Sequence, residues 1–319
     1  MLRALAAAWP EAHIAFAGHP KRIETLRHLP FVTRLQAITK TVAPWLAHLP
    51  GPAFDLALVF GHDAPLVRYA LRRARRVVAF RQPHAALNAR LHAIAGQDGY
   101  SPRHAVTHLL QAIRPLGIPP AGMHLSYRVT DAEDAWARRL LASMPDRGHP
   151  LVGLQVASFP TKGFRDWPLA HFEALCGRIL DAHPQAHFLI FGGMLEAART
   201  ARLQRRLASR ASLFAGRLSL RQTAALMNRI DLYVGVDTGP THIMGALHRP
   251  MVALYHPTSP SRALAPLEHP CCHVVDHPLA DRGATPDTPM AEITVDMVWE
   301  KVRAALSGHF PPPLTTPWE

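Results

Sequence analysis

The sequence has few cysteines, few lysines and no long apolar run. Its cysteines are one isolated residue, Cys176, and the adjacent pair Cys271 and Cys272, which make no disulfide framework and favour a reducing compartment. No window of about 18 uninterrupted apolar residues occurs, so we expect no membrane span. The N-terminal segment has a short apolar run but no small-residue cleavage site, so we expect no signal peptide and a cytoplasmic protein.

Three common active-site motifs are also missing. The sequence contains neither G-x-G-x-x-G nor G-x-x-x-x-G-K-[ST], which disfavours the ordinary dinucleotide-binding and P-loop classes. It contains no Gly-x-Ser-x-Gly elbow, which disfavours an α/β-hydrolase. Any nucleotide site must therefore be built differently.

Positive charge is in excess. The 319 residues carry 35 basic against 23 acidic side chains, only four of the basic ones being lysine, and 48% are hydrophobic. This composition predicts a folded chain of about two domains. A net charge of +12 favours anionic partners such as nucleotides, phosphorylated glycans or a lipid surface. No aromatic interleaving accompanies the arginines, so we expect no nucleic acid partner.

Short apolar runs alternate with amphipathic stretches, which predicts α/β domains with parallel sheets covered by helices on both faces. The turn-rich segment Met144–Pro150 is the best boundary. We expect domains at 1–147 and 148–308, followed by a loosely held Pro-rich tail at 309–319. The predicted strands are His13–Gly18, Phe54–Phe60, Arg76–Phe80, Pro150–Val156, His187–Phe191, Leu213–Ala215, Leu232–Val236, Met251–Tyr255 and Cys272–Val275.

The strongest chemical signal is the segment from Asp231 to His242. An apolar strand ends at Val236, a tight Asp-Thr-Gly turn follows, and Pro240 suits the first turn of a helix. Such a turn directs free backbone N–H groups and a positive helix end at the edge of a sheet, where a phosphate binds. Asp237 could accept hydrogen bonds from sugar hydroxyls. A plain capped strand–turn–helix explains the same residues.

Three further loops follow predicted strands. One bears Thr258 and Ser259, a second bears Gly192 and Gly193 with Glu196 at the start of a helix, and a third bears Ser158, Lys162 and Arg165. Glu196 could bind ribose hydroxyls, and either cation could neutralise a diphosphate. Each loop also has an ordinary explanation: a Pro-rich connection, an acid placed favourably on a helix dipole, or solvated loop charges.

In combination these segments resemble glycosyltransferase family 9, the ADP-heptose:lipopolysaccharide heptosyltransferases. The resemblance covers about 120 residues of the second half and is looser in the first. The residues that carry it are Ser158, Arg165-Asp-Trp-Pro-Leu-Ala-His-Phe172, Gly192-Gly193, Ala215-Gly-Arg-Leu-Ser-Leu220, Asp237-Thr-Gly-Pro-Thr-His242 and His256-Pro-Thr-Ser-Pro260.

The resemblance implies a GT-B fold, with two facing Rossmann-like domains. The C-terminal domain would hold the nucleotide-sugar, which for this family is ADP-heptose, and the N-terminal domain the acceptor, a lipopolysaccharide core or related glycan. It implies an inverting transfer without a metal or other cofactor. It also implies a cytoplasmic enzyme in peripheral contact with the inner-membrane surface.

The resemblance assigns roles to individual residues. The segment that contains Asp237 and His242 would bind the donor diphosphate and sugar, and Glu196 would bind the ribose. Leu218 would lie beside the base, and Arg165 stands where the family has a lysine, so that Lys162 is its alternative. The full donor-binding set is Ser158, Gly193, Glu196, Leu218, Asp237, Thr238, Gly239, Pro240, Thr241, His242 and Thr258.

The N-terminus departs from the family pattern. The family begins with a strand, a Gly-Asp loop that holds its catalytic base, and a helix. Here Met1 to Leu5 resembles the end of that helix, so the N-terminal domain is expected to lack its first strand. His62 and Asp63 follow another strand and should face the same cleft, which makes Asp63 a substitute base. A loop aspartate beside a helix start is the alternative explanation.

A cluster of arginines is the candidate acceptor site. Arg68, Arg72 and Arg76 lie in its densest part and would face acceptor phosphates or anionic lipid headgroups. A solvated helix face accounts for them equally. The alternative function is a non-catalytic protein that binds a nucleotide-sugar or a partner and has lost the catalytic base.

Metal sites are not expected. His104 and His108 have the spacing of some zinc ligands but lack the accompanying glutamate, and the segment His269–His277 reads as a strand whose alternate residues diverge. A metal-dependent glycosyltransferase of the GT-A fold would need an Asp-x-Asp motif at a strand end to hold Mn²⁺ or Mg²⁺. The nearest match, which starts at Asp131, reads as a helix start.

Overall fold

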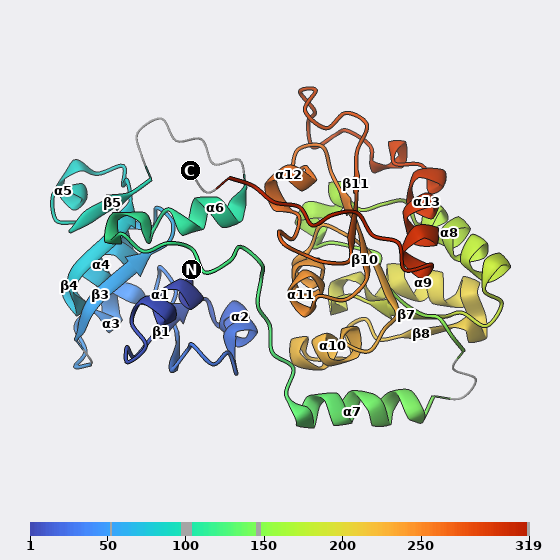
Figure 1. Ribbon diagram of the computed structural model, residues 1–319, viewed down its shortest axis with the longest axis horizontal. Helices are drawn as coiled ribbons and strands as arrows, with labels where there is room; N and C mark the ends of the chain where they lie inside the picture. The colour runs from blue at the N-terminus through green and yellow to red at the C-terminus, as the bar shows by residue number, and fades with distance from the viewer. Residues whose placement is uncertain (52, 97–103, 145–147, 318–319) are drawn as a thin grey trace. The chain divides into compact units, whose positions relative to one another are not determined.

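The computed structural model describes residues 1–51, 53–96, 104–144 and 148–317 (Figure 1). The chain is α/β, as predicted, and divides into two compact units. Unit 1 consists of residues 1–123 with Thr316 and Pro317, and unit 2 of His124–Thr315. Among the described residues, no helix is both long and apolar enough to cross a bilayer.

Unit 2 is built on one continuous parallel sheet. Its order is β11-β10-β9-β6-β7-β8. Every residue of β6, β7, β9 and β10 is buried, as expected for parallel strands covered on both faces. The strands are β6 (Leu151–Gln155), β7 (His187–Phe191), β8 (Ala211–Leu213), β9 (Leu232–Val236), β10 (Met251–Tyr255) and β11 (Cys272–Asp276).

Helices pack on both faces of this sheet. On one face α8 (Leu169–Ala182), α9 (Ala197–Leu207) and α13 (Val295–Leu306) form a core with strand residues such as Leu154. On the other face lie α7 (Asp131–Ala142), α10 (Leu220–Met227) and α11 (Gly239–Leu247). Alternate strand side chains supply the two cores. A short helix, α12 (Ser261–Leu264), follows β10.

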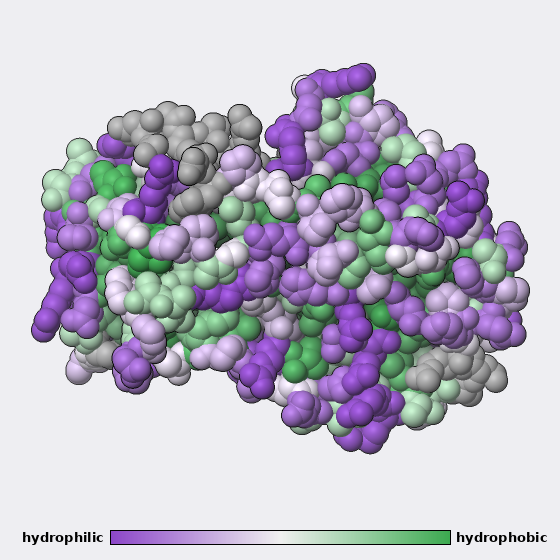
Figure 2. Space-filling view, in the orientation of Figure 1, coloured by the Kyte–Doolittle hydropathy of each residue, from purple (hydrophilic) through white to green (hydrophobic). Residues whose placement is uncertain are grey.

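The boundary between the units falls after Met123, not after residue 147 as the sequence suggested. The reason is helix α7, whose Ala137 and Leu141 are buried in the core of unit 2. Its Glu133 also pairs with Arg221 of α10 at 2.6 Å. The outer face of α7 is mostly hydrophilic (Figure 2).

Unit 1 has two small parallel sheets where a doubly wound domain has one. The orders are β1-β2 and β3-β4-β5, and in the described chain no strand precedes α1. Residues of β1 alternate between exposed and half-buried, and β3 has no fully buried residue. Among the described residues no ladder of hydrogen bonds joins the two sheets. The elements are α1 (Leu2–Ala8), β1 (Ala15–Gly18), α2 (Pro20–Ile23), β2 (Arg34–Ala37), α3 (Ala43–Leu46), β3 (Phe54–Val59), α4 (Ala64–Arg73), β4 (Ala74–Phe80), α5 (Ala85–Asn88), β5 (Ala93–Ala95) and α6 (Ala105–Leu110).

The C-terminal tail is held more firmly than expected. The backbone N–H of Glu268 donates to the carbonyl of Leu314 at 2.8 Å, and His273 Nε2 donates to the carbonyl of His309 at 2.8 Å. Residues 309–315 therefore belong to unit 2 by contact, although most of their side chains are exposed.

Candidate functional site

Three loops at the carboxyl edge of the unit 2 sheet are joined through one arginine. Arg165, on the loop after β6, donates through Nη1 to Asp237 Oδ2 at 2.7 Å and through Nη2 to Ser259 Oγ at 2.9 Å. Asp237 follows β9 and Ser259 follows β10, and these strands are neighbours of β6 or of each other. The turn of Asp237 and the loop of Ser259 thus lie together, as expected for neighbouring parallel strands, and Arg165 joins both to the loop after β6.

Asp237 is a buried carboxylate that lies between Arg165 and His242. Its backbone N–H donates to the Leu254 carbonyl at 3.1 Å, which extends the sheet by one residue and fixes the turn. His242 Nε2 lies 3.3 Å from Oδ1, and Oδ1 makes no well-aligned hydrogen bond with any described residue. Oδ1 therefore has acceptor capacity left for a hydroxyl group of a ligand.

Helix α11 starts at this turn. Thr238 is its N-cap, its side chain makes no capping hydrogen bond, and Pro240 lies in the first turn as predicted. The N–H of His242 is the first to reach a helical carbonyl, that of Thr238 at 3.2 Å. The N–H groups before it and the helix dipole point toward Asp237 and Arg165, where they favour an anion.

Thr241 does not face this edge, which corrects its place among the candidate donor contacts. It is fully buried, and its Oγ1 donates to the Val236 carbonyl at 2.5 Å and lies 2.8 Å from the Tyr233 hydroxyl. Burial raises the pKa of Tyr233, which keeps this hydroxyl neutral. Thr241 and Tyr233 therefore hold the turn from behind.

Ser158 is also used internally. Its hydroxyl lies 2.6 Å from Asp166 Oδ1 and 2.7 Å from the Lys162 carbonyl, and Arg199 of α9 binds the other oxygen of Asp166. These bonds close the loop on which Arg165 sits. Sequence reasoning missed Asp166 and Arg199, although Asp166 directly follows Arg165 in the recognised motif.

Lys162 and Thr258 lie at the exposed side of the same edge. Lys162 is exposed, and its Nζ is 5.7 Å from the centre of the Phe164 ring. The N–H of Thr258 donates to Nδ1 of the buried His256 at 3.2 Å, while His256 Nε2 donates to the Thr288 carbonyl at 3.1 Å. His256 is therefore neutral, and burial lowers its pKa.

The loop after β7 offers a free carboxylate beside apolar side chains. Gly193 is the N-cap of a short 3-10 turn, and a Cβ placed there would stand 2.6 Å from Glu196 Oε2, so the carboxylate lies over the glycine. Within the described chain Glu196 pairs with no cation. Met194 and Leu195 are exposed next to it, and Leu218 is half-buried.

In unit 1 the predicted base Asp63 and two of the predicted acceptor arginines lie at opposite edges of the β3-β4-β5 sheet. Asp63 is the exposed N-cap of α4 and follows the carboxyl end of β3, where His62 Nδ1 also donates to the Arg81 carbonyl at 3.0 Å. Arg72 is in the last turn of α4, and Arg76 is at the start of β4. Arg72 and Arg76 thus lie at the amino edge of the sheet and cannot share a site with Asp63. The third predicted acceptor residue, Arg68, is exposed halfway along α4.

The histidines considered as metal ligands have structural partners. His104 Nδ1 accepts from the Val106 N–H at 3.1 Å and caps α6, and His108 stacks on Phe80 with ring centres 4.4 Å apart. His269 Nδ1 accepts from the Cys271 N–H at 3.2 Å, and His277 Nε2 donates to the Pro289 carbonyl at 3.1 Å. Across the described ranges no three metal-ligating side chains gather.

Sequence comparison matches this chain to one family. The model of "Glycosyltransferase family 9 (heptosyltransferase)" matches residues 66–286, more than two thirds of the chain. Lipopolysaccharide heptosyltransferase 1 of Escherichia coli K12 is 30% identical over 165 residues, which are 50% of this chain and 49% of that protein. The chain therefore spans about half the length of the curated relatives it matches.

Solved structures share the fold over almost the whole chain. The glycosyl transferase family 9 protein of Veillonella parvula superposes with a TM-score of 0.80 at 18% identity, covering 96% of this chain and 92% of its own. The ADP-heptose heptosyltransferase II of Escherichia coli gives 0.75 at 20% identity, with 96% and 93% covered. The GT-B fold prediction is confirmed.

Proposed function

The chain belongs to glycosyltransferase family 9, and we propose that it transfers heptose from ADP-heptose to a lipopolysaccharide-core or related glycan acceptor, with inversion and without a metal ion. The observation that supports the proposal most is the Arg165 bridge, which joins the loops after β6, β9 and β10 beside the start of α11. A cation fixed by two partners is preorganised to receive a diphosphate.

The donor is assigned to the carboxyl edge of unit 2. The diphosphate binds the N–H groups at the start of α11, near Arg165 and Lys162, and Asp237, whose buried Oδ1 lies 3.3 Å from His242, accepts from a sugar hydroxyl. Glu196 accepts from the ribose hydroxyls. Met194, Leu195 and Leu218 supply an apolar surface for the base.

The reaction we propose is a single displacement. An acceptor hydroxyl oxygen attacks the anomeric carbon of the donor, and the bond from that carbon to the diphosphate oxygen breaks with its electron pair. Asp63, exposed and without a capping bond, takes the hydroxyl proton. Arg165, Lys162 and the α11 dipole stabilise the negative charge that develops on ADP, the role that a divalent cation fills in other transferases.

The setting follows from the acceptor. A lipopolysaccharide precursor lies in a membrane, so we propose a cytoplasmic enzyme in peripheral contact with the inner-membrane surface. A protein that binds the nucleotide-sugar but lacks transfer activity is the second candidate, since the side chain of Asp63 makes no capping hydrogen bond that would fix it in place as a base.

Calorimetric titration of the chain with ADP, UDP and GDP in EDTA tests the donor site. We expect selective ADP binding that weakens about 10- to 100-fold in Asp237→Asn and Arg165→Lys, because each change removes charged hydrogen bonds. Arg206→Ala is the matched control, since Arg206 is an exposed arginine of α9 that lies 3.8 Å from Glu173.

Two outcomes would count against the proposal. Selectivity for UDP or GDP would overturn the choice of donor, and a folded chain that binds none of the three nucleotides would overturn the donor site. Transfer is then measured with ADP-heptose and a delipidated core oligosaccharide. ADP binding without transfer, unaffected by Asp63→Asn, would establish the non-catalytic alternative.

A further inference from the structure

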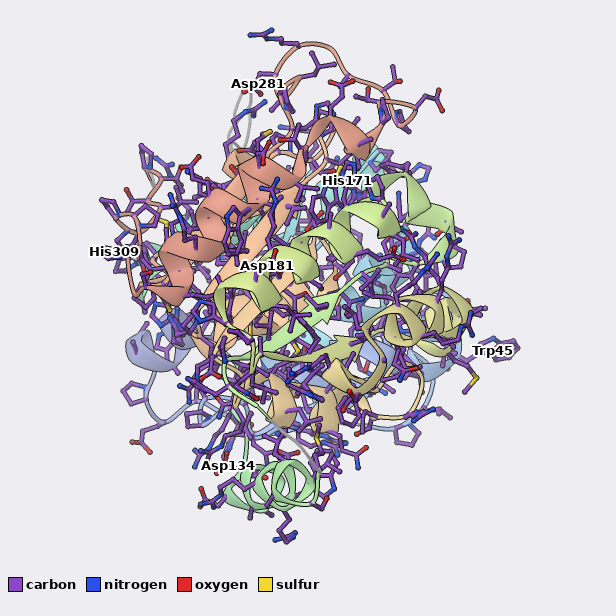
Figure 3. The ribbon with its side chains drawn as sticks, turned by 90° about the vertical axis from the view of Figure 1, so that its right-hand side faces the viewer. Trp45, Asp134, His171, Asp181, Asp281 and His309 are labelled. Carbon is purple, nitrogen blue, oxygen red and sulfur yellow. The ribbon has the colours of Figure 1, made fainter. Side chains whose placement is uncertain are left out.

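An exposed apolar stripe lies on the segment around α3 in unit 1. Val42, Trp45 and Leu49 are 44%, 77% and 56% exposed and are spaced three and four residues apart. Backbone bonds from Leu46 N to Val42 O and from His48 N to Trp45 O, both 3.1 Å, wind the segment into helical turns. Val42, the N-cap of α3, and Trp45 are about one turn apart, and Leu49 lies in the bend that follows the helix. Trp45 projects clear of the surrounding side chains (Figure 3).

Arginines of α4 hold this stripe in place. Arg73 Nη2 donates to the carbonyls of Leu46 and Leu49 at 2.9 and 2.6 Å, and Arg72 Nη1 donates to His48 Nε2 at 2.8 Å. Ala43 on the inner side of the segment is fully buried. The apolar stripe is thus a built surface whose exposed side chains are presented outward.

The surroundings of the stripe are basic. Lys40, Arg72, Arg75 and Arg76 are exposed around it, and the nearest acid in the sequence, Asp55, already lies 3.6 Å from Arg75. Residues 1–123 contain 15 arginines and lysines against five acidic residues, whereas residues 124–319 contain 20 against 18. Nearly all of the chain's excess positive charge therefore belongs to unit 1.

The stripe and its arginines occupy the amino edge of the β3-β4-β5 sheet. Residues 42–49 lead into β3, and Arg72 and Arg75 lie where α4 returns to the start of β4. The carboxyl edge, with His62 and Asp63, is at the other end of the same strands. The surface is therefore available to a partner while the carboxyl edge remains free for chemistry.

We infer that this amino-edge surface, Val42, Trp45 and Leu49 with Lys40, Arg72, Arg75 and Arg76, docks unit 1 on an anionic lipid bilayer. Tryptophan and leucine enter the headgroup region, where an amphipathic indole is favoured, and the arginines bind lipid phosphates. The inference rests on the proposed function in one respect, because a glycolipid acceptor places the enzyme at a membrane.

Vesicle flotation with the full chain tests the docking surface. The probes are vesicles of phosphatidylcholine alone and of phosphatidylcholine with about a third phosphatidylglycerol. We expect binding only to the anionic vesicles, with a blue shift of tryptophan emission. Trp45→Ser with Leu49→Ser should weaken binding at least tenfold, and Arg72→Gln with Arg75→Gln should weaken it about tenfold and reduce its dependence on salt.

Matched controls test whether binding depends on this surface or only on the number of tryptophans and arginines in the chain. Trp9→Ser removes another exposed tryptophan of unit 1, and Arg138→Gln with Arg206→Gln removes the same charge from unit 2. We expect both controls to bind like the wild type. Equal binding to neutral vesicles, or equal losses in the controls, would overturn the docking surface.

Two further measurements keep this inference separate from the proposed function. Sedimentation velocity without lipid should give the same species for wild type and Trp45→Ser with Leu49→Ser; dissociation of a dimer in that variant, with vesicle binding unchanged, would show that the stripe joins two copies instead. Transfer to a soluble oligosaccharide should be unchanged in the same variant. Vesicle binding without any transfer would remove the proposed function and leave the docking surface standing.

Discussion

In the described part of unit 2 six parallel strands form one sheet, and every residue of its four central strands is buried. In the residues of unit 1 that the structure describes, five parallel strands form two separate sheets, and their residues are largely exposed or half-buried outside the second half of β4. Both units alternate strand and helix, so the difference lies in the continuity of the sheet. A continuous sheet brings several carboxyl ends together at one edge, and the Arg165 bridge depends on that.

Unit 1 differs in chemistry as well. Its strands begin beside arginines and an exposed tryptophan, whereas several ionic groups of unit 2 pair across elements, as Glu133 does with Arg221. The comparison suggests a division of labour, in which unit 2 holds the donor with preorganised groups and unit 1 meets a charged acceptor and its membrane. If the two units differ in this way, substitutions in them should also differ in their effect on the free energy of unfolding.

We expect the largest effect, loss of folding, when a fragment of unit 2 begins after α7 instead of before it. A fragment of residues 124–315 should fold and bind ADP, whereas residues 148–315 should not, because removing α7 exposes the core around Leu151 and Tyr233. Circular dichroism melting and ADP titration measure both fragments. Equal folding of the two fragments would show that α7 is dispensable and would restore the boundary after residue 147.

The next largest effect is the loss of stability when a leucine is replaced in the unit 2 sheet and in the unit 1 sheet. Leu154 of β6 is fully buried, and Leu58 of β3 is half-buried. Leu154→Ala should lower the free energy of unfolding by about 3 to 4 kcal/mol, and Leu58→Ala by about 1 to 2 kcal/mol. Urea denaturation measures both. Similar losses would mean that the unit 1 sheet is as well covered in solution as that of unit 2.

Continuous apolar runs made unit 2 the easier half to predict. His187–Phe191, Leu232–Val236 and Met251–Tyr255 were predicted with the bounds that the structure has. β2 and β5 were missed, because strands of four and three residues with polar or exposed positions carry no clear period. The site's loops followed from the rule that parallel strands end at one edge.

The direction of individual side chains could not be predicted in the same way. Whether Ser158 and Thr241 face a ligand or the interior depends on Asp166 and Tyr233, which the motif does not mark as their partners. The boundary after Met123 depends on a bond between Glu133 and Arg221, 88 residues apart in the sequence. Such pairings are set by packing, and local sequence carries little of that information.

A slightly smaller loss than that of Leu154→Ala is expected at Arg221, which we contrast with the exposed Arg75. Arg221 is buried against Glu133, whose pKa burial would raise but hydrogen bonds from Arg221 and Thr130 lower to about 2. Arg221→Met should cost about 3 kcal/mol, because it leaves Glu133 without its partner. Arg75→Met should cost less than about 0.5 kcal/mol, since Arg75 and Asp55 are 82% and 86% exposed. Equal costs in urea denaturation would contradict the contrast.

The smallest effect is a pH dependence that comes from a buried histidine of unit 2. Burial, with a smaller contribution from His248, lowers the pKa of His269 from 6.5 to about 4 in the folded chain. Its Nδ1 accepts from the Cys271 N–H, so the folded state requires the neutral ring. The unfolded chain binds the proton first, and the stability that His269 contributes is complete above pH 6.5 and decreases as the pH falls toward 4.

Between pH 7 and pH 5 this loss should amount to about 2 kcal/mol. Urea denaturation at several pH values measures it, and His269→Phe should flatten the profile over that window by the same amount. A His269→Phe profile as steep as that of the wild type would assign the acid sensitivity to other buried histidines of unit 2, of which His256, fixed in its neutral form beside Thr258, is the first to test.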